Sequence, residues 1–379
     1  QMKDEGTDYY TALIKEFEAQ NPDIKIEYTN VPDAETVLMT RMASDQVPDV
    51  FTHFPLDASF REQVKAGYMM DLTGEKMLDN VADDILDISL IDSKSYSIPV
   101  SLNMLGVYYN KDLFDAAGVE YPSNDMTWEQ YDELAAKLTS GEGSAKVYGS
   151  HNHTWQALVT NWAVQDGKNT VVEKDYSFLK PWYEEALALQ DNGYIQDYST
   201  LKTANIHYSS VFKNQQCAMM PMGTWFIATL VQDRKAGNFD FNWGVTRIPH
   251  PAGIAAGSTV GSVTPIAVNA KSDVPDEAWE FVRFATSEAG AEVLADNSVF
   301  PAITTPGVVS RLASIEGFPE DGKAALSVTN FVFDRPVDAK MAAVRKVIEE
   351  EHDAIMIGEE DIDTGIANMN ERAEEARSR

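Results

Sequence analysis

The side chains with the greatest chemical reactivity do not form a catalytic pattern in this sequence. His151 and His153 flank Asn152, and two histidines at i and i+2 without a third ligand nearby are weak evidence for metal. The single cysteine, Cys217, lies in the apolar run 217–222, where it is expected to pack as a small hydrophobic residue. The motifs of serine hydrolases, P-loop proteins, dinucleotide enzymes and HExxH zinc proteins are absent. We therefore expect no metal, no cofactor and no enzyme.

Carboxylates are abundant, and glycoside hydrolysis requires only two of them at a suitable separation. Among 60 aspartate and glutamate residues no pair stands out, so a secreted glycosidase is the less favoured alternative. The acidic segment 361–365 has part of a calcium-loop spacing but lacks the rest of the twelve-residue pattern. It is expected to be a solvated acidic surface.

Aromatic residues in turn-like positions point to binding. Trp155 follows the polar segment 150–154, and Trp225 follows a Gly-Thr turn at the end of an apolar run. Flat aromatic faces beside amides and carboxylates suit a ligand with apolar faces and many hydroxyls, which is a sugar. Trp162 lies in a helical pattern, so we expect it in the core, whereas Trp155 and Trp225 are expected at the site.

The charge of the chain excludes several classes of partner. Lys and Arg number 30 against 60 acidic residues, which gives a formal charge of −30 and a pI near 4.4. Such a surface repels nucleic acid and anionic lipid. One cysteine allows no intrachain disulfide, and no apolar run approaches the roughly 18 to 20 residues that span a bilayer. No signal segment is visible and a helix follows Gln1 closely, which predicts a processed N-terminus.

The periodicity of apolar residues indicates an α/β chain. With 379 residues and 44% hydrophobic content, it is long enough for two or three domains. Tyr10, Leu13, Ile14 and Phe17 predict a first helix that ends at 21–22. Strands are expected at 24–28, 49–51, 97–100, 105–109, 217–222, 243–249 and 263–270. Further helices are expected over 33–44, from Thr127 with a capping box to Gln130, from about 179 to the Asn192–Gly193 stop, from Pro275, and from about 337 onward. Helices and strands in this order predict a largely parallel sheet.

Seven segments occur in an order that resembles the family 1 extracellular solute-binding proteins of ABC importers, the maltose-binding-protein-like class. They are FEAQNPDIKI, VPDVF, SIPVSLNMLGVYYNKDLFDAAGV, TWEQYDELAAKL, FKNQQCAMMPMGTW, VTPIAVNAKSDVPDEAWEFVRFATSEAG and FPA. The resemblance covers essentially the whole chain. It implies a periplasmic-binding-protein-like α/β fold of two lobes joined by strands that cross near 102–103, 257–263 and 302–305. The N-terminal lobe would hold 1–102 and 263–302; the C-terminal lobe would hold 103–262 and 303–379.

The resemblance also implies ten ligand-binding residues. They are Trp225, Asn103, His53, Asp57, Asn152, His153, Trp155, Thr224, Asp4 and Met341. Trp225 matches a stacking tryptophan of the family and is preceded by Thr224 in place of proline. His53 stands where maltose-binding protein has tryptophan, and Asn103 where it has glutamate.

Two departures from the family pattern concern the ends of the chain. The family's first strand is missing, so its acidic and basic pair is placed only near Asp4 and Glu5. Met341 stands where the family has a stacking tryptophan among the C-terminal helices. Maltose itself is therefore not the expected ligand.

The resemblance implies a monomeric extracellular binding protein, periplasmic or anchored to the cell surface as a lipoprotein. It would capture a carbohydrate, expected to be an oligosaccharide, and deliver it to the permease subunits of an ABC transporter. An acidic sugar or a polyamine are the alternatives within the binding class. An acidic sugar needs arginine in the cleft, for which the candidates are Arg41, Arg61, Arg247 and Arg335.

Overall fold

The computed structural model describes residues 9–30, 34–52, 58–75, 81, 83–86, 90–303, 305–334, 338 and 340–378. The helices are α1 (Tyr9–Gln20), α2 (Ala34–Ala43), α3 (Ala58–Lys65), α4 (Asp83–Leu86), α5 (Lys111–Ala117), α6 (Trp128–Leu138), α7 (Gln156–Val164), α8 (Lys180–Asp191), α9 (Tyr198–Thr203), α10 (Tyr208–Lys213), α11 (Trp225–Lys235), α12 (Pro275–Ala285), α13 (Glu288–Asp296), α14 (Pro306–Leu312), α15 (Met341–Ile357) and α16 (Ile362–Ser378). The strands are β1 (Val50–Thr52), β2 (Leu90–Ile91), β3 (Lys94–Ser95), β4 (Ile98–Asn110), β5 (Tyr148–Ser150), β6 (Cys217–Gly223), β7 (Trp243–Arg247), β8 (Ser258–Val268) and β9 (Asn330–Phe333).

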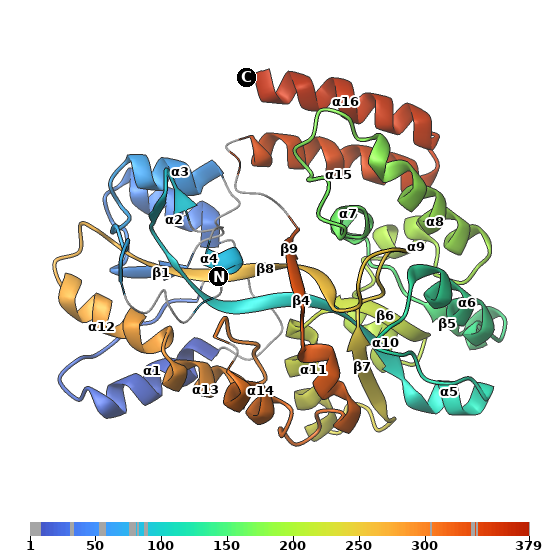
Figure 1. Ribbon diagram of the computed structural model, residues 1–379, viewed down its shortest axis with the longest axis horizontal. Helices are drawn as coiled ribbons and strands as arrows, with labels where there is room; N and C mark the ends of the chain where they lie inside the picture. Colours follow the sequence, from blue (N-terminus) through green and yellow to red (C-terminus); the bar gives the residue numbers. More distant parts are fainter. Residues whose placement is uncertain are drawn as a thin grey trace.

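Two long antiparallel strands, β4 and β8, run through the middle of the molecule (Figure 1). At one end of this pair lie α1, α2, α3, α12 and α13, and at the other end lie α5, α6, α8, α15 and α16 (Figure 1). The chain thus forms two groups of elements that share a central pair of strands. The predicted α/β class with two lobes and crossing strands is confirmed.

The main sheet has the order β1-β8-β4-β6-β5, with β7 paired to β4 and β9 paired to β8. Its pairs are antiparallel except β5–β6 and β8–β9. The prediction of a largely parallel sheet was therefore wrong. The physical reason is that β4 and β8 cross the molecule in opposite directions. The strands β1, β6 and β7 then pair with one of these two strands in antiparallel orientation. The two strands predicted at 97–100 and 105–109 are one continuous strand, β4.

Local signals around the first helix were read correctly only in part. The apolar stripe of α1 is buried through Tyr10, Leu13 and Phe17, as predicted. Segment 24–28 is not a strand, although Ile24 and Ile26 are partly buried. The amide of Ile26 donates to Glu18 Oε1 (2.9 Å) instead of to a neighbouring strand. A side chain of α1 therefore satisfies this amide in place of the strand pairing that the alternation of apolar and polar residues had predicted.

The capping box before α6 is confirmed in atomic detail. Thr127 Oγ1 accepts from the amide of Gln130 (3.3 Å), and Gln130 Oε1 accepts from the amide of Thr127 (3.0 Å). We expect Thr127→Ala to lower the free energy of unfolding by about 1 kcal/mol. The amide of Gln130 loses its acceptor, and the reciprocal capping box is broken. Urea titration checks this value, and Thr127→Ser should retain most of the stability.

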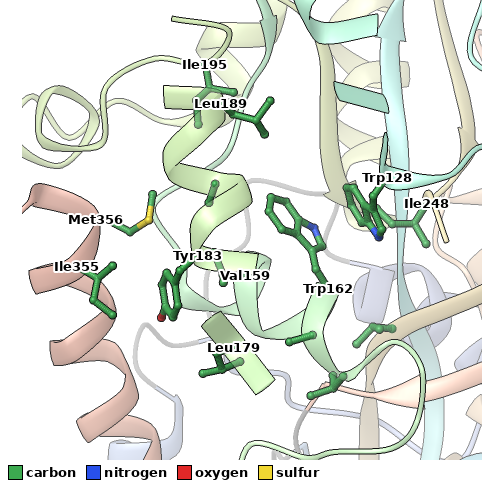
Figure 2. Packing of buried hydrophobic residues seen from close by; sticks show 14 of the residues in the cluster. Trp128, Val159, Trp162, Leu179, Tyr183, Leu189, Ile195, Ile248, Ile355 and Met356 are labelled. Carbon is green, nitrogen blue, oxygen red and sulfur yellow. The ribbon is translucent and has the colours of Figure 1, made fainter. Parts of the chain in front are cut away.

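The core contains the two residues predicted to lie there. Trp162 of α7 is 1% exposed, and its ring centroid lies 4.7 Å from that of Trp128, the first residue of α6 (Figure 2). Cys217 is fully buried in β6, and burial raises the pKa of its thiol well above the usual value. A thiol in this state is a packing residue and not a nucleophile.

The C-terminal prediction also holds, because α15 and α16 account for most of the chain after 340 and pack against each other (Figure 1). Asp361 accepts from the amide of Thr364 (2.8 Å), so the acidic segment 361–365 forms the start of α16. Over the part of the chain that the structure covers, no helix is long and apolar enough to cross a membrane.

Candidate ligand-binding site

An aromatic cluster forms where the loop before α7 meets the first residues of α10 and α11. Its members are His153, Trp155, His207, Tyr208 and Trp225. The ring of Trp155 lies 6.2 Å from that of Trp225, 5.6 Å from Tyr208 and 4.5 Å from His153. His207 lies 4.1 Å from Tyr208, measured between ring centroids. Residues from three distant segments therefore present their rings together.

Trp225 is the first residue of α11 and is partly buried. Its indole Nε1 donates to the hydroxyl of Tyr208 (3.2 Å), which fixes the plane of the ring. The ring lies so close to Gly223 that a Cβ there would come within 1.9 Å of Trp225 Cζ3. The Gly-Thr turn thus ends β6, begins a helix and leaves room for the indole at the same time.

Gly223→Ala should therefore displace the indole, because a methyl group and the Trp225 ring would occupy the same space. We expect a loss of stability of about 1 to 3 kcal/mol, typical of overpacking. Tryptophan emission should shift with it, since the ring loses its bond to Tyr208. Unchanged stability and emission would contradict this account of the turn.

Trp155 lies at the entrance of α7 and is 38% exposed, one of few large hydrophobic side chains at the surface of the described chain. Its backbone is extended, and its side chain makes no hydrogen bond that caps α7. The ring of His153 packs against it, with the two ring planes nearly perpendicular at 86°. A supported and exposed indole offers a flat apolar surface for a ligand.

The loop between β5 and α7 holds polar atoms that are buried without hydrogen-bond partners. These atoms are Nδ1 and Nε2 of His151, Nδ2 and Oδ1 of Asn152, and Nδ1 of His153. His151 is 1% exposed and Asn152 is 8% exposed. An unsatisfied buried polar group costs about 1 to 3 kcal/mol, so this loop is expected to find its partners in water or ligand.

Both loop histidines are uncharged at neutral pH. Burial, followed by the proximity of His153 and His207, lowers the pKa of His151 to about 3. Burial, followed by His207 and Lys202, lowers the pKa of His153 to about 4. A neutral imidazole offers one donor and one acceptor, which matches a hydroxyl group on both counts. No group of three or more His, Cys, Asp or Glu suited to a metal ion occurs among the residues described.

A small pocket of about 10 Å³, room for roughly one water molecule, lies beneath this loop. It is lined by Asn152, His153, Trp155, Leu158, Val159, Ala186, Gln190, Ile195, Gln196, Tyr198, His352 and Met356. Figure 2 shows Val159, Leu189 and Ile195 on one side of this region and Met356 of α15 on the other. His352 bonds to the hydroxyl of Tyr183 through Nδ1 (3.1 Å), while its Nε2 has no partner. The pocket therefore reaches from the polar loop to His352 and Met356 of α15.

Charged groups next to the site are paired with each other. Lys202 Nζ lies 2.9 Å from Asp353 Oδ2, and Tyr198 donates to the same carboxylate. The hydroxyl of Tyr198 also lies 3.1 Å from the carbonyl of Thr154, at the end of the polar loop. The aromatic cluster and its polar loop contain neither carboxylate nor arginine.

The structure brings together four of the residues predicted at the ligand: Asn152, His153, Trp155 and Trp225. Asn103 lies on β4, partly buried, with Nδ2 at 3.5 Å from Thr264 Oγ1. Met341 is 2% exposed and packs in a core cluster. It lines a separate small pocket of about 10 Å³ with Ala157, Thr160, Asn161, Val171, Asp334, Arg345 and Ile348.

The remaining predicted residues differ in what can be said of them. The hydroxyl of Thr224, 8% exposed, bonds to the main chain of β4. His53, Asp57, Asp4 and Glu5 lie outside the described residues, so their assignment stays a prediction.

Sequence reasoning missed His207 and Tyr208, and considered His151 only as a metal ligand. The available signal was local. His207 and Tyr208 are two ring side chains at the start of a short helix, after a turn in which Asn205 has a positive φ of 48°. That arrangement is the one that drew attention to Trp155 and Trp225.

Comparison with known proteins agrees with this fold. The family of bacterial extracellular solute-binding proteins matches residues 3–292. A multiple sugar-binding protein of Streptococcus mutans is 30% identical over 294 residues, which cover 73% of this chain and 67% of that protein. A sugar transporter of Rhizobium etli, solved in an open conformation, is 38% identical with a TM-score of 0.89 over 99% of this chain and 98% of its own.

A more distant likeness concerns the fold alone. An ABC substrate-binding protein of Listeria monocytogenes, solved with cycloalternan, has a TM-score of 0.82 at 23% identity, over 98% of this chain and 96% of its own. With the family match over residues 3–292, the crossing strands and the two groups of elements, this chain belongs to the bacterial extracellular solute-binding proteins.

Proposed function

We propose that this protein captures a neutral carbohydrate, expected to be an oligosaccharide, and delivers it to the permease subunits of an ABC transporter. The observation that carries the proposal is the exposed indole of Trp155 beside Trp225 and the five unpartnered polar atoms of the loop 151–153. The similarity to a multiple sugar-binding protein of Streptococcus mutans and to a sugar transporter of Rhizobium etli supports it.

The chemistry of the site matches the two surfaces of a sugar ring. The apolar face of a pyranose would pack on the indoles, where burial of apolar area supplies affinity. Hydroxyl groups at the edge of the ring would bond to Asn152 and the neutral imidazoles, each of which accepts and donates. Binding would also relieve the cost of leaving these atoms without partners.

The same observations count against charged solutes. A uronic acid is expected to need a guanidinium, and a polyamine to need carboxylates, yet the aromatic cluster and its loop supply neither. Of the four arginines considered, Arg247 donates Nε to the carbonyls of Ala324 (3.2 Å) and Ser327 (2.9 Å). Arg61 Nε is buried without a hydrogen-bond partner, and Arg335 lies outside the described residues. The described cluster and its loop hold no carboxylate, and the neighbouring Asp353 is paired with Lys202, so we propose reversible binding without catalysis.

We further propose that closure of two lobes traps the ligand. The N-terminal lobe would comprise 1–102 and 263–302, and the C-terminal lobe 103–262 and 303–379, with β4 and β8 as the connection. Ligand contact with both lobes would favour the closed state by its difference in affinity for the two states. The protein would act as a monomer outside the cell, in the periplasm or held at the surface by a lipid anchor.

Titration of a panel of solutes tests the proposal. The panel holds neutral oligosaccharides such as raffinose and maltotriose, a uronic acid oligomer and spermidine, with tryptophan emission and reducing-sugar release followed together. Saturable change with a neutral oligosaccharide and no product supports the proposal. If only the charged solutes give saturation, the ligand is a charged solute and not a neutral carbohydrate. Release of reducing sugar would show that the protein is an enzyme.

A further inference from the structure

Strand β4 changes its hydrogen-bond partners between Met104 and Leu105. Its first part, Ile98 to Met104, pairs with β8. Its second part, from Leu105 onward, pairs with β6 and β7. The strand therefore belongs to one half of the sheet before this point and to the other half after it (Figure 1).

Thr224 binds β4 on the first side of this change. Its amide donates to the carbonyl of Met104 (2.9 Å), and its Oγ1 donates to the carbonyl of Leu102 (3.2 Å). The same Oγ1 accepts from the amide of Met104 (3.3 Å). Thr224 thus makes three hydrogen bonds to the part of β4 that pairs with β8.

Gly223, one residue earlier, is bound on the second side. It pairs with Leu105 in the β4–β6 ladder, and its carbonyl accepts from the hydroxyl of Tyr108 (2.9 Å). Two consecutive residues of the turn are therefore attached to the two sides of the partner change. The residue that follows them is Trp225, whose indole belongs to the aromatic cluster.

We propose that Thr224 is a positioning residue that couples contact at the Trp225 indole to rotation about β4. The inference rests on the proposed function, because it assumes that the ligand lies against Trp225 and that the lobes rotate. Rotation of the proposed lobes about residues 102–103 moves the carbonyl of Leu102, in the N-terminal lobe, relative to Gly223 and Thr224, in the C-terminal lobe. This motion acts on the turn through the hydrogen bond from Thr224 Oγ1 to that carbonyl. The torsion angles of the turn must then change, and the indole moves with them. A ligand that fixes the indole consequently favours one rotation of the strand.

The hydroxyl of Thr224 is the part of this connection that a substitution can remove without a change of volume. Thr224→Val keeps the shape but leaves the carbonyl of Leu102 and the amide of Met104 without their partner. Thr224→Ser keeps the hydroxyl. Thr246→Val is the matched control, since it removes another buried threonine hydroxyl, which donates to Asn124 Oδ1 (2.9 Å) and not to β4.

Distances between the two halves of the molecule give the readout. Fluorophores at Glu16→Cys on α1 and Glu371→Cys on α16 occupy exposed positions at opposite ends of the molecule, whereas the native Cys217 is fully buried. Single-molecule energy transfer is recorded without sugar and at saturating raffinose or maltotriose. Affinity is measured in parallel by calorimetry.

Without sugar, Thr224→Val should shift or broaden the distance distribution, while Thr224→Ser and Thr246→Val match the parent. With sugar, the parent closes and Thr224→Val closes incompletely, with an affinity lower by about 5- to 10-fold, in the range of ordinary coupling energies. A Thr224→Val protein that matches the parent in both distributions would overturn the inference. If neither sugar binds the parent, the proposed function fails while the sugar-free comparison still decides the role of Thr224.

Hydrogen exchange of the unaltered protein provides a second measurement should Thr224→Val not fold. The amide of Met104 should exchange more slowly when sugar is bound, because the bond to Thr224 is held more firmly. Equal or faster exchange of this amide in the bound protein would contradict the coupling.

Discussion

Trp225→Ala is expected to weaken carbohydrate binding by about 2 kcal/mol, roughly 30-fold, while costing much less in stability. The indole is partly buried and held by one hydrogen bond to Tyr208, so its removal leaves the packing of α11 mostly intact. The apolar surface offered to the sugar is lost with it. Calorimetric titration gives the affinity, and thermal unfolding gives the stability.

Trp162→Ala is the matched control for this experiment. That indole is 1% exposed and packs on Trp128, so its truncation should cost about 3 to 5 kcal/mol of stability. Affinity in the folded fraction should remain close to that of the parent. If the two variants behave in the opposite way, Trp225 is a core residue and the site has been placed wrongly.

Acid should destabilise the protein well above the pH at which carboxylates titrate. Burial lowers the pKa values of His151 and His352 to about 3 and that of His153 to about 4. In the unfolded chain each would titrate near 6.5, so the unfolded state binds more protons once the pH falls below that value. Stability is therefore complete above about pH 7 and is lost progressively toward the folded pKa values.

The expected loss by pH 5 is about 2 kcal/mol for each of the three histidines, a large part of an ordinary folding free energy. Urea unfolding at pH 8, 7, 6 and 5 measures it. The window lies above that of carboxylates such as Asp71, whose pKa is lowered to about 2, chiefly by its hydrogen bond from Lys94.

His352→Gln tests the assignment of this loss to individual residues. Glutamine keeps a polar partner for Tyr183 and does not titrate, so about a third of the pH dependence should disappear. The charged neighbours of His352, Asp353 and Lys202, remain in place. A pH dependence identical to that of the parent would show that His352 does not contribute, and a flat parent profile would refute the prediction as a whole.

How far the sequence predicted the fold depended on whether the deciding contact was local. The stripe of α1 and the capping box at Thr127 are set within a few residues, and both were predicted. The strand expected at 24–28 failed because Glu18 supplies the partner of Ile26 from a neighbouring helix. Continuity of β4 was missed because its residues are mostly buried along the whole strand, which gives no alternation to follow.

The site was predictable where a single position carried the signal. Trp155 and Trp225 stood out by their turn-like settings, and the structure places their rings 6.2 Å apart. Tyr208 carried a local signal at the start of a short helix, but its hydrogen bond from Trp225, which joins residues 17 positions apart, became visible only in the tertiary structure. The buried, unpartnered state of the 151–153 loop likewise depends on helices packed around it, and no sequence pattern contains that information.

The change of partners along β4 also sets the order in which its two parts can pair during synthesis and refolding. The segment after Met104 meets its partners once residues 217–247 exist, whereas Asn103 pairs with Ser262 and lies 161 positions from its side-chain partner Thr264. The first half of the strand, which is mostly buried in the finished molecule, must therefore wait longer as an unpaired apolar edge. Such distant pairing is slow and exposes the chain to aggregation until it forms. The feature that joins the two halves of the molecule is thus also the step at which the nascent chain most needs protection.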